Sequence, residues 1–296
     1  MKYYLGIDGG GTRTTVAVSD ECGNILFKEF GKTINFYSVG MEKASQNLKD
    51  IICKVSDKLD TDIFEGVFIG CSALDNEADA QTLNALCGGI KAKKIAMNSD
   101  LYIALKSVDA KICPCVAICG TGSMAAGEDE NGNVVISGGW GHIIGDEGSG
   151  YAIAVSALKK CCELCDQGMS SPLLEKANEY FKVDDFRKSI DIIYSPETTK
   201  DVIAGFAADV GSICDIDNNA HEIIITEAHS FAKTILILLR KVNKCSTLGL
   251  YGGLFEHNQL FKDTLIADIL AEFPYVQPQL LNTPPEESAL KLARNL

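Results

Sequence analysis

One stretch near the start of the chain decides the fold, Tyr3-Tyr4-Leu5-Gly6-Ile7-Asp8-Gly9-Gly10-Gly11-Thr12-Arg13-Thr14-Thr15-Val16-Ala17-Val18. It predicts a strand, a phosphate-binding loop and a second strand, because an apolar run, a carboxylate and a glycine turn follow one another directly. Three consecutive glycines let backbone N–H groups converge on an anion. The alternative is a hairpin with a glycine-rich turn, since short glycine motifs have low specificity.

Asp8 stands at the mouth of this loop. A carboxylate beside bound phosphates is repelled by them unless a divalent cation lies between, and Mg²⁺ held through water by one carboxylate and the phosphates is the usual solution. We therefore predict that Asp8 binds the metal. The predicted phosphate contacts, which offer N–H and hydroxyl donors, are Gly10, Gly11, Thr12 and Thr14.

Composition limits the classes of partner. The 296 residues are 46% hydrophobic, which is enough for a large core and favours two domains over one. Asp and Glu outnumber Lys and Arg by 40 to 27, and the net charge of −13 repels nucleic acid and anionic lipid. No apolar run reaches the ~18 residues of a membrane span, and Asp8 interrupts the first one. We therefore expect a cytoplasmic protein with neither nucleic acid nor membrane as partner.

The twelve cysteines are scattered through apolar stretches of a long chain, which indicates buried thiols in a reducing compartment. The close pairs are Cys162 with Cys165, which form a C-x-x-C, and Cys113 with Cys115. A zinc or iron–sulfur site at these pairs is the alternative.

Beyond the opening hairpin, the chain switches to a β-α-β pattern. A turn at Gly23-Asn24 leads to a third antiparallel strand. Apolar periodicity then predicts strands 25–30, 66–70 and 94–97 and helices 41–59 and 77–86. Asp100 follows the last of these strands, and ligands of open α/β sheets collect at the carboxyl ends of strands. The alternative is a helix N-cap supplied by Asn98, Ser99 or Asp100, and the local pattern favours the cap.

An internal sequence repeat at an offset of 109 residues is the most informative feature. Gly11-Thr12 corresponds to Gly120-Thr121, and Gly23-Asn24-Ile25 corresponds to Gly132-Asn133-Val134. A repeated strand-loop-strand-turn-strand pattern predicts two like-folded halves, the second of which opens near Lys111. Each half then supplies one phosphate loop. Two such loops facing each other across a cleft indicate hinge-closing phosphoryl transfer.

A glycine-rich segment, residues 137–150, follows the third strand of the second half. Such a loop brings the backbone close to a ligand, and it contains the only Trp of the chain, Trp140, together with Asp146. An aromatic ring beside a hydrogen-bonding carboxylate suits a sugar. In the alternative, Trp140 lies in the core and Asp146 or Ser149 caps the next helix. His142 is left out of the catalytic set, because a lone histidine is more often structural.

The middle of the chain carries helix start signals at 170–172, 184–185, 195–197 and 218–219, and is interpreted as scaffold and homodimer surface. A buried strand at 247–251 then ends in Gly252-Gly253, which opens a helix through Phe273. Glycine at this strand-to-helix turn allows close approach of a flat ligand such as adenine. A last helix, 289–295, is expected to fold back across the two halves.

Four segments together carry a family resemblance, Gly6-Ile7-Asp8-Gly9-Gly10-Gly11-Thr12, Gly120-Thr121-Gly122-Ser123, Gly138-Gly139-Trp140-Gly141-His142 with Gly145-Asp146-Glu147-Gly148-Ser149, and Gly252-Gly253. The chain resembles the N-acetylglucosamine kinase branch of the BadF/BadG/BcrA/BcrD ATPase family, within the actin, Hsp70 and sugar-kinase fold. The resemblance implies an α/β protein of two ribonuclease-H-like domains with a nucleotide cleft between them. The expected domains are 1–110 with the C-terminal helix 283–296, and 111–282 with a helical insertion.

The resemblance also implies roles for residues. Asp100 becomes the general base of a sugar kinase that uses ATP and Mg²⁺, which reverses the local preference for a cap. The implied nucleotide contacts are Asp8, through the hydrated Mg²⁺, with Gly10, Gly11, Thr12, Thr14, Gly120, Thr121, Gly122, Gly252 and Gly253. The implied contacts to an amino sugar are Asn35, Phe36, Ser123, Gly139, Trp140, Gly141 and Asp146.

The implied reaction is phosphorylation of N-acetylglucosamine to its 6-phosphate, with N-acetylmuramate or glucosamine as alternative substrates. A second class is the ATP-driven activator of a radical dehydratase or reductase, which holds an iron–sulfur cluster through cysteines. A third is a sugar-sensing protein without catalysis, for which loss of the base is expected. The sugar-loop motif argues against the second class, and the presence of Asp100 argues against the third.

Overall fold

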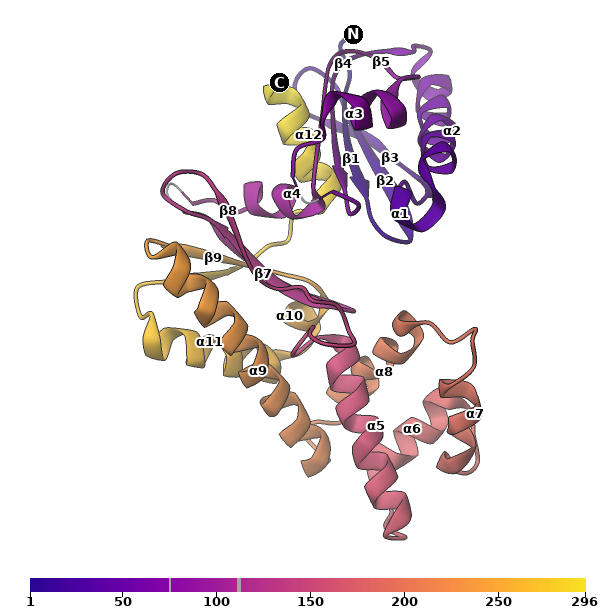
Figure 1. The fold of residues 1–296 in the computed structure, drawn as a ribbon, viewed down its shortest axis with the longest axis vertical. Coiled ribbons are helices and arrows are strands. Elements are labelled where there is room, and N and C mark those ends of the chain that lie inside the picture. Colours follow the sequence, from indigo (N-terminus) through magenta and orange to yellow (C-terminus); the bar gives the residue numbers. More distant parts are fainter. Residues whose placement is uncertain (75, 111–112) are drawn as a thin grey trace. The chain divides into compact units, whose positions relative to one another are not determined.

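A computed structural model describes residues 1–74, 76–110 and 113–296. The chain divides into two compact units, unit 1 with Met1–Ser107 and Asn282–Leu296 and unit 2 with Val108–Leu281 (Figure 1). Lys111, the predicted start of the second half, lies outside the described residues. Each unit has its own sheet and its own hydrophobic core, and each is therefore a layered α/β body.

The sheet of unit 1 has the strand order β3-β2-β1-β4-β5. Its strands are β1 (Tyr4–Gly9), β2 (Arg13–Ser19), β3 (Ile25–Lys32), β4 (Ile63–Cys71) and β5 (Lys91–Asn98). The first three are antiparallel, as predicted, and β4 and β5 run parallel to β1. Strands β4 and β5 begin earlier than predicted. In β4, Glu65 interrupts the apolar pattern after Ile63 and Phe64, and β5 opens with exposed lysines, although Ile63 pairs with Lys91. The carboxyl ends of β1, β4 and β5 thus lie at one edge.

Helices cover both faces of this sheet (Figure 1). They are α1 (Phe36–Val39), α2 (Met41–Leu59), α3 (Ala80–Cys87), α4 (Asp100–Lys106) and α12 (Pro285–Asn295). Helices α2 and α3 pack on the main core of unit 1, and α4 and α12 share a smaller apolar cluster around Phe68. Helix α3 begins at Ala80 and not at Glu77, because Asp79 accepts a hydrogen bond from the backbone N–H of Thr82 at 2.7 Å and caps it.

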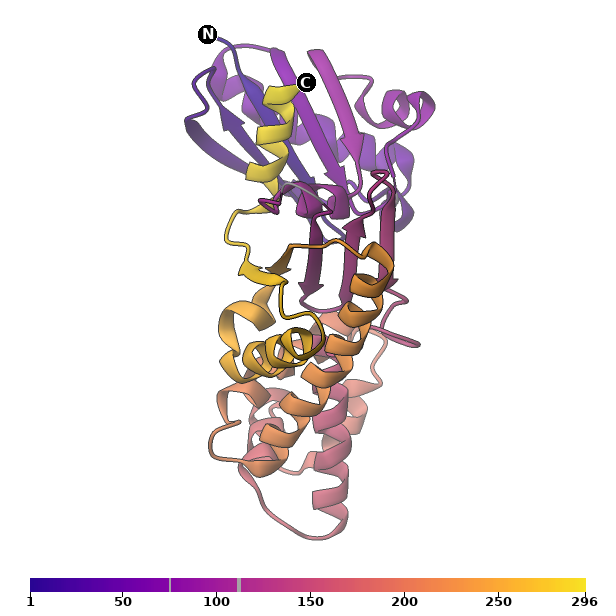
Figure 2. The same cartoon turned by 90° about the vertical axis from the view of Figure 1, so that its left-hand side faces the viewer.

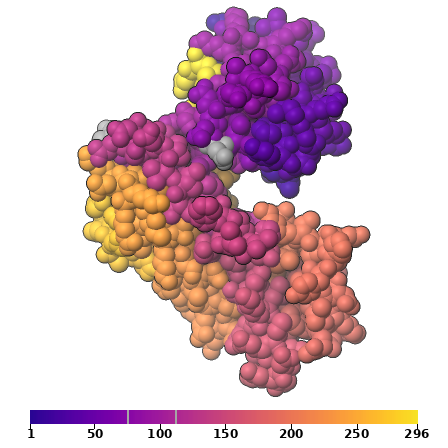
Figure 3. Space-filling view, viewed as in Figure 1, coloured from indigo at the N-terminus to yellow at the C-terminus, as the bar shows by residue number. Residues whose placement is uncertain are grey.

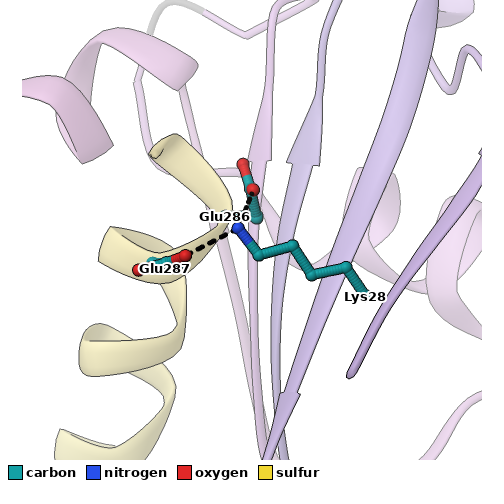
Figure 4. Close-up of polar contacts among 3 residues, drawn as sticks. All are labelled: Lys28, Glu286 and Glu287. Carbon is teal, nitrogen blue, oxygen red and sulfur yellow. Dashed lines mark hydrogen bonds and ion pairs between the residues drawn. The ribbon is translucent and has the colours of Figure 1, made fainter. Parts of the chain in front are cut away.

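Two glycines let α12 lie directly on the sheet. A Cβ atom at Gly6 would come within 2.1 Å of the Leu290 nitrogen, and one at Gly66 within 2.3 Å of the Ala293 oxygen. The Lys28 ammonium group of β3 then reaches the first turn of α12, where it donates to Glu286 at 2.8 Å and Glu287 at 2.6 Å (Figure 4). The expectation that this helix crosses both halves is corrected, since α12 belongs to unit 1.

Unit 2 repeats the topology of unit 1. Its strands are β6 (Cys115–Cys119), β7 (Ser123–Glu128), β8 (Val134–Gly138), β9 (Thr247–Tyr251) and β10 (Gln277–Leu280), in the order β10-β9-β6-β7-β8. The repeat extends to single hydrogen bonds: Asp20 accepts from the N–H groups of Cys22 and Asn24, and Asp129 accepts from those of Asn131 and Asn133. The predicted internal repeat is confirmed. Strand β10 escaped prediction, because its four residues alternate weakly and include a proline.

Unit 2 also contains seven α-helices among the residues that the structure describes. They are α5 (Gly150–Asp166), α6 (Pro172–Phe181), α7 (Ser189–Ile193), α8 (Lys200–Ser212), α9 (Asn218–Val242), α10 (Gly253–His257) and α11 (Gln259–Glu272), with a 3₁₀ turn at Phe186–Lys188. Helix α9 packs against α11 (Figure 2), and α6 contacts α7 and α8, so that residues 172–212, salmon in Figure 3, form one part of the surface of unit 2.

Two predicted helix boundaries in unit 2 were wrong. Helix α8 begins at Lys200 and not at 195–197, where a turn closes first. The helix expected to run from Gly253 to Phe273 is two helices, because Asn258 is extended and its side chain caps α11. No described helix of either unit is long and apolar enough to span a bilayer.

Candidate active site

Asp8 and Asp100 lie on one face of the sheet of unit 1, at the carboxyl ends of its strands. Asp8 on β1 pairs with Gly70 on β4, and Gly70 pairs in turn with Asn98 at the end of β5. A Cβ atom at Gly70 would stand 3.5 Å from the Asp100 Cα and 2.0 Å from the Ile103 side chain. Glycine at this position therefore lets α4 approach the sheet and sets Asp100 beside the row that carries Asp8.

Asp100 is not the cap of α4. The Ser99 hydroxyl accepts a hydrogen bond from the Tyr102 N–H at 3.1 Å and fills that role, while Asp100 is the first helical residue. The Asp100 carboxylate accepts only from the neighbouring Leu101 N–H, at 2.7 Å, among the hydrogen bonds of the described residues. It is open to solvent on one side, and desolvation by the surrounding protein raises its pKa. The local preference for a cap is corrected.

The pKa of Asp8 rises from 3.8 to about 7. Burial of its carboxyl group is the main cause, followed by the negative charges of Asp100 and Glu286, and Arg13 opposes them. A bound cation would favour the ionised carboxylate in such surroundings. The described residues contain no group of three or more His, Cys, Asp or Glu placed to hold a metal ion directly. The partly buried carboxylate of Asp8, at the end of β1 before the first glycine loop, fits a hydrated Mg²⁺ that would meet the protein through this residue.

The first glycine loop is held by hydrogen bonds and packing on one side and is exposed on the other. The Thr33 hydroxyl donates to the Gly10 carbonyl at 2.7 Å and accepts from the Asn35 N–H at 3.0 Å. A Cβ atom at Gly9 would meet Ile34 at 2.5 Å, whereas one at Gly11 would touch nothing within 4 Å. Since Gly11 lacks a positive φ as well, neither packing nor backbone conformation requires glycine there. Gly11 and Thr12 are exposed and offer a free surface to a ligand.

The structure corrects the assignment of Thr14. Its side chain is fully buried, and its hydroxyl donates to the Lys32 carbonyl at 2.9 Å. Strand β2 has already begun at Arg13, so Thr14 belongs to the ladder between Gly9 and Gly31 and not to the loop. Thr14 therefore leaves the predicted set of phosphate contacts.

Asn35 and Phe36 lie at the start of α1, close in sequence to Thr33. The side-chain oxygen of Asn35, Oδ1, caps the helix by accepting from the N–H groups of Tyr37 and Ser38, both at 3.1 Å. Its amide nitrogen donates to the Ser72 hydroxyl at 3.0 Å, which leaves one amide hydrogen for a ligand. Phe36 packs against the core of unit 1.

The second glycine loop is held against the start of α5. The Gly120 carbonyl accepts from the Gly150 N–H at 2.8 Å, and the Thr121 carbonyl accepts from the Tyr151 N–H at 3.2 Å. A Cβ atom at Gly122 would come within 2.7 Å of the Asp146 carboxylate. Within unit 2, Gly120 and Thr121 thus contact the start of α5, and Gly122 lies against Asp146.

The 139–149 loop has a buried part and an exposed part. Asp146 is 6% exposed and adopts a left-handed backbone with φ of 60°, whereas the Trp140 side chain is 73% exposed. The core alternative for Trp140 is therefore wrong, and Ser149 is the cap of α5. Gly139 and Gly141 have φ of 73° and 82°, which an L side chain rarely adopts. Ser123 donates its hydroxyl to the Glu147 carbonyl at 2.7 Å, so it fastens this loop instead of offering that hydrogen to a substrate.

Glu227 of α9 anchors the end of the same loop, and sequence reasoning missed it. One carboxylate oxygen accepts from the Gly148 N–H at 3.0 Å, and the other accepts from the Ser156 hydroxyl at 2.7 Å. A Cβ atom at Gly148 would lie 2.6 Å from the Glu227 carbonyl oxygen, so the loop and α9 are in direct contact. No local motif in a 25-residue helix marks this residue.

A cavity of about 400 Å³ lies within unit 2. It is bounded by the second glycine loop, the start of α5, one face of α8, and the segment from α10 to the start of α11. Of the predicted nucleotide contacts, Gly120, Thr121 and Gly253 line it. Gly252 has a different reason to be glycine, since its φ is 119° and a Cβ atom would stand 2.2 Å from the Cys119 oxygen.

The α8 wall of this cavity corrects the interpretation of the middle region as scaffold. Ala204, Ala208 and Gly211 line the cavity at the i, i+4 and i+7 spacing of one helix face. The small residues of this segment were the available signal. They leave room above the helix backbone for a flat ligand.

The cysteine pairs do not form a metal centre with the residues that the structure describes. All twelve cysteines are free thiols. Cys162 and Cys165 line a separate cavity of about 170 Å³ beside Arg187, and Cys113 and Cys115 are buried.

Two units of one topology, each with a glycine-threonine loop between its first strands, define the class of the actin-like ATPases and sugar kinases. The chain belongs to the BadF/BadG/BcrA/BcrD ATPase family, whose family model matches residues 5–277.

Relatives agree with this assignment along almost the whole chain. An N-acetylmuramic acid/N-acetylglucosamine kinase of Clostridium acetobutylicum is 30% identical over 286 residues, covering 94% of this chain and 93% of that protein. An N-acetyl-D-glucosamine kinase of Dictyostelium discoideum is 27% identical over 99% of this chain and 98% of its own. The crystal structure of a provisional N-acetylglucosamine kinase of Chromobacterium violaceum has the same fold, with a TM-score of 0.75, 20% identity and 99% coverage of both chains.

Proposed function

We propose that the protein transfers the γ-phosphoryl group of ATP to a hydroxyl group of an amino sugar, with N-acetylglucosamine as the substrate and its 6-phosphate as the product. The observation that carries this proposal is the carboxylate of Asp100. It is released from capping by Ser99, has a raised pKa, and stands beside Asp8 at the carboxyl ends of the strands. The names of the two relatives described above support the substrate class.

In the proposed reaction Asp100 is the general base. A sugar hydroxyl oxygen attacks the γ-phosphorus, its proton passes to the Asp100 carboxylate, and the bond to the ADP oxygen breaks. A raised pKa strengthens the carboxylate as a base near neutral pH, and general-base catalysis typically contributes ~10²- to 10⁴-fold in rate. Asp8 would hold a hydrated Mg²⁺, which would neutralise charge on the phosphate oxygens.

The nucleotide contacts follow from the two glycine loops. We assign Gly10, Gly11, Thr12 and Thr121 to phosphate groups, because their backbone or hydroxyl donors lie on exposed or half-exposed loop surface. The cavity of unit 2 takes the nucleoside, with Gly253 and the small residues of α8 as its walls. Its volume falls within the ~300–1,000 Å³ typical of ligand pockets.

The amino-sugar contacts rest on three side chains. Asp146 offers carboxylate oxygens to hydroxyl groups, Asn35 offers its second amide hydrogen, and Trp140 offers an exposed aromatic face. N-acetylmuramate is the alternative substrate that one relative's name favours, because that name includes both sugars. Its additional carboxylate would be repelled by the carboxylate of Asp146.

A coupled assay of ADP release over hexoses, glucosamine, N-acetylglucosamine and N-acetylmuramate tests the proposal. We expect turnover with N-acetylated amino sugars and dependence on Mg²⁺. Binding of ATP without turnover on any sugar would remove the kinase assignment. Equal rates on glucose and N-acetylglucosamine would contradict the substrate class while keeping the reaction.

A further inference from the structure

Asn258, between α10 and α11, lines the cavity of unit 2 and is 7% exposed. Its side-chain oxygen accepts a hydrogen bond from the Phe261 N–H at 2.9 Å and caps α11. This cap fixes which end of the amide is oxygen, so the other end is the NH₂ group. Within the described part of the chain, no acceptor binds this NH₂ group.

The NH₂ group is directed at the α8 wall of the cavity. A Cβ atom at Gly211 would stand only 2.8 Å from the Asn258 amide nitrogen. Among the described residues, the side-chain N and O atoms that are fully buried and lack a hydrogen-bond partner do not include this nitrogen. The nitrogen therefore has some accessible surface in the cavity. Asn258 thus presents an amide NH₂ group at the surface of this cavity. A ligand that supplies an acceptor there would replace water as the partner of this group.

The lining selects the part of a nucleotide that this donor meets. Thr121, proposed above to contact phosphate, lies on the glycine-loop side of the cavity, whereas Asp201 lies on the α8 side, where the described lining offers no Lys or Arg to a phosphate group. Ala204, Ala208 and Gly211 instead form a flat apolar surface that suits an aromatic ring. A purine ring lying on this surface carries acceptor nitrogens at N1, N3 and N7.

We propose that Asn258 reads the base of the nucleotide, by donating from its amide nitrogen to a ring nitrogen of the purine. The assignment rests on the proposed function, because it requires a nucleoside in this cavity. It makes Asn258 a specificity-determining residue that holds two groups at once. The oxygen stabilises α11, and the nitrogen binds the base.

The Asn258→Asp variant separates these two tasks. Aspartate caps a helix as well as asparagine does, so α11 keeps its first turn. The donor, however, becomes an acceptor that faces the acceptor nitrogens of the ring. We expect the KM for ATP to rise at least about tenfold, with the KM for the sugar and the melting temperature nearly unchanged. The matched control is Asn219→Asp, which makes the same chemical change in the first turn of α9 outside this cavity.

Nucleotide analogues test the proposal on the unmodified protein. Calorimetry with ATP and with its 1-deaza, 3-deaza and 7-deaza forms asks which ring nitrogen accepts the hydrogen bond. We expect one of the three to bind about tenfold more weakly than ATP to the wild type. The same analogue should show no further loss with Asn258→Ser, which keeps a capping oxygen but has no amide.

The outcomes separate the assignment of Asn258 from the proposed kinase function. An Asn258→Asp enzyme whose KM for ATP stays within twofold of wild type would overturn the assignment of Asn258 and leave the kinase intact. So would three deaza analogues that all bind like ATP. A wild type that binds no ATP at all would overturn the proposed function together with this inference.

Discussion

Asp100 and Ser99 are neighbours with separable tasks, which gives a direct test of the base. Asp100→Asn removes the proton acceptor but leaves the Ser99 cap, so we expect turnover to fall at least about a hundredfold while stability changes by less than about 1 kcal/mol. Ser99→Ala removes the cap and should cost about 1 kcal/mol of stability. Steady-state kinetics and urea denaturation of both variants measure this contrast. Near-normal turnover of Asp100→Asn would leave the reaction without its base.

Asp8 should make folding stability depend on pH when no metal is bound. Its folded pKa of about 7 lies above its ordinary value of 3.8. Between pH 4 and 7, Asp8 is therefore still protonated in the folded state but already ionised in the unfolded state. The free energy of unfolding falls as the pH rises through this window. Asp8→Asn should gain about 2 kcal/mol at pH 8 and almost nothing at pH 4. This value is half of the roughly 4 kcal/mol that the shift converts to, because Asp8 is only half-buried.

Denaturation in the presence of a chelator at both pH values measures this difference. If Asp8→Asn gained the same unfolding free energy at pH 4 and at pH 8, Asp8 would not titrate in this range. Addition of Mg²⁺ should stabilise the wild type and not Asp8→Asn.

At the residue scale, the kind of site was predictable from the sequence. Which side chains of that site are available to bind a ligand was less predictable. Asp8 and the exposed part of the first loop were predictable from the glycine motif. The burial of Thr14 was not, because it depends on where the ladder of β2 begins. The release of Asp100 was also hidden, since Asn98, Ser99 and Asp100 are all good caps and only the geometry shows that Ser99 acts.

At the element scale, the contact between α12 and β1 can be tested with two glycines. Gly6→Ala would drive a Cβ atom into the backbone of α12, at 2.1 Å from the Leu290 nitrogen, and should cost about 2–3 kcal/mol. Gly11→Ala meets no atom and needs no special φ, so stability should stay within about 0.5 kcal/mol. Activity should show the reverse order, because Gly11 lies on the proposed phosphate surface. Equal stability of the two variants would contradict the packing argument.

The anchor between α9 and the 139–149 loop should affect the sugar more than ATP. Glu227→Gln weakens the hydrogen bonds to Gly148 and Ser156 without changing side-chain size. We expect the KM for the sugar to rise about threefold to tenfold while the KM for ATP stays within twofold. The matched control is Glu222→Gln, which lies on the same helix and should change neither value. A parallel rise in both constants would indicate a general loss of structure.

Elements with long apolar periodicity were predictable, whereas boundaries set by tertiary contacts were not. The bounds of α2 agree with the prediction at both ends. Strand β10 could not be foreseen, because it is stabilised by pairing with β9 and not by its own pattern. The role of α8 was missed, because a helix face of alanine and glycine is also typical of close helix packing. Only the cavity beside this face indicates a binding role.

At the scale of the whole molecule, the two units have separate cores, and only unit 1 is discontinuous in sequence. A chain ending after Leu281 should therefore keep the hydrogen-exchange protection of α5 and α9 and lose that of β1 and β4. Exchange monitored by mass spectrometry distinguishes these segments. Equal protection of β1 in the full and shortened chains would show that α12 is not needed for the sheet of unit 1.

The two glycines under α12 have a consequence for synthesis on the ribosome. Strands β1 and β4 emerge early, yet the surface at Gly6 and Gly66 is complete only when a helix made after all of unit 2 arrives. At about 5–20 residues per second, that surface waits roughly 10–40 s after β5 is made. All of unit 2, through Leu281, is made during this interval. The exposed face of β1 is therefore where a chaperone would be expected to bind.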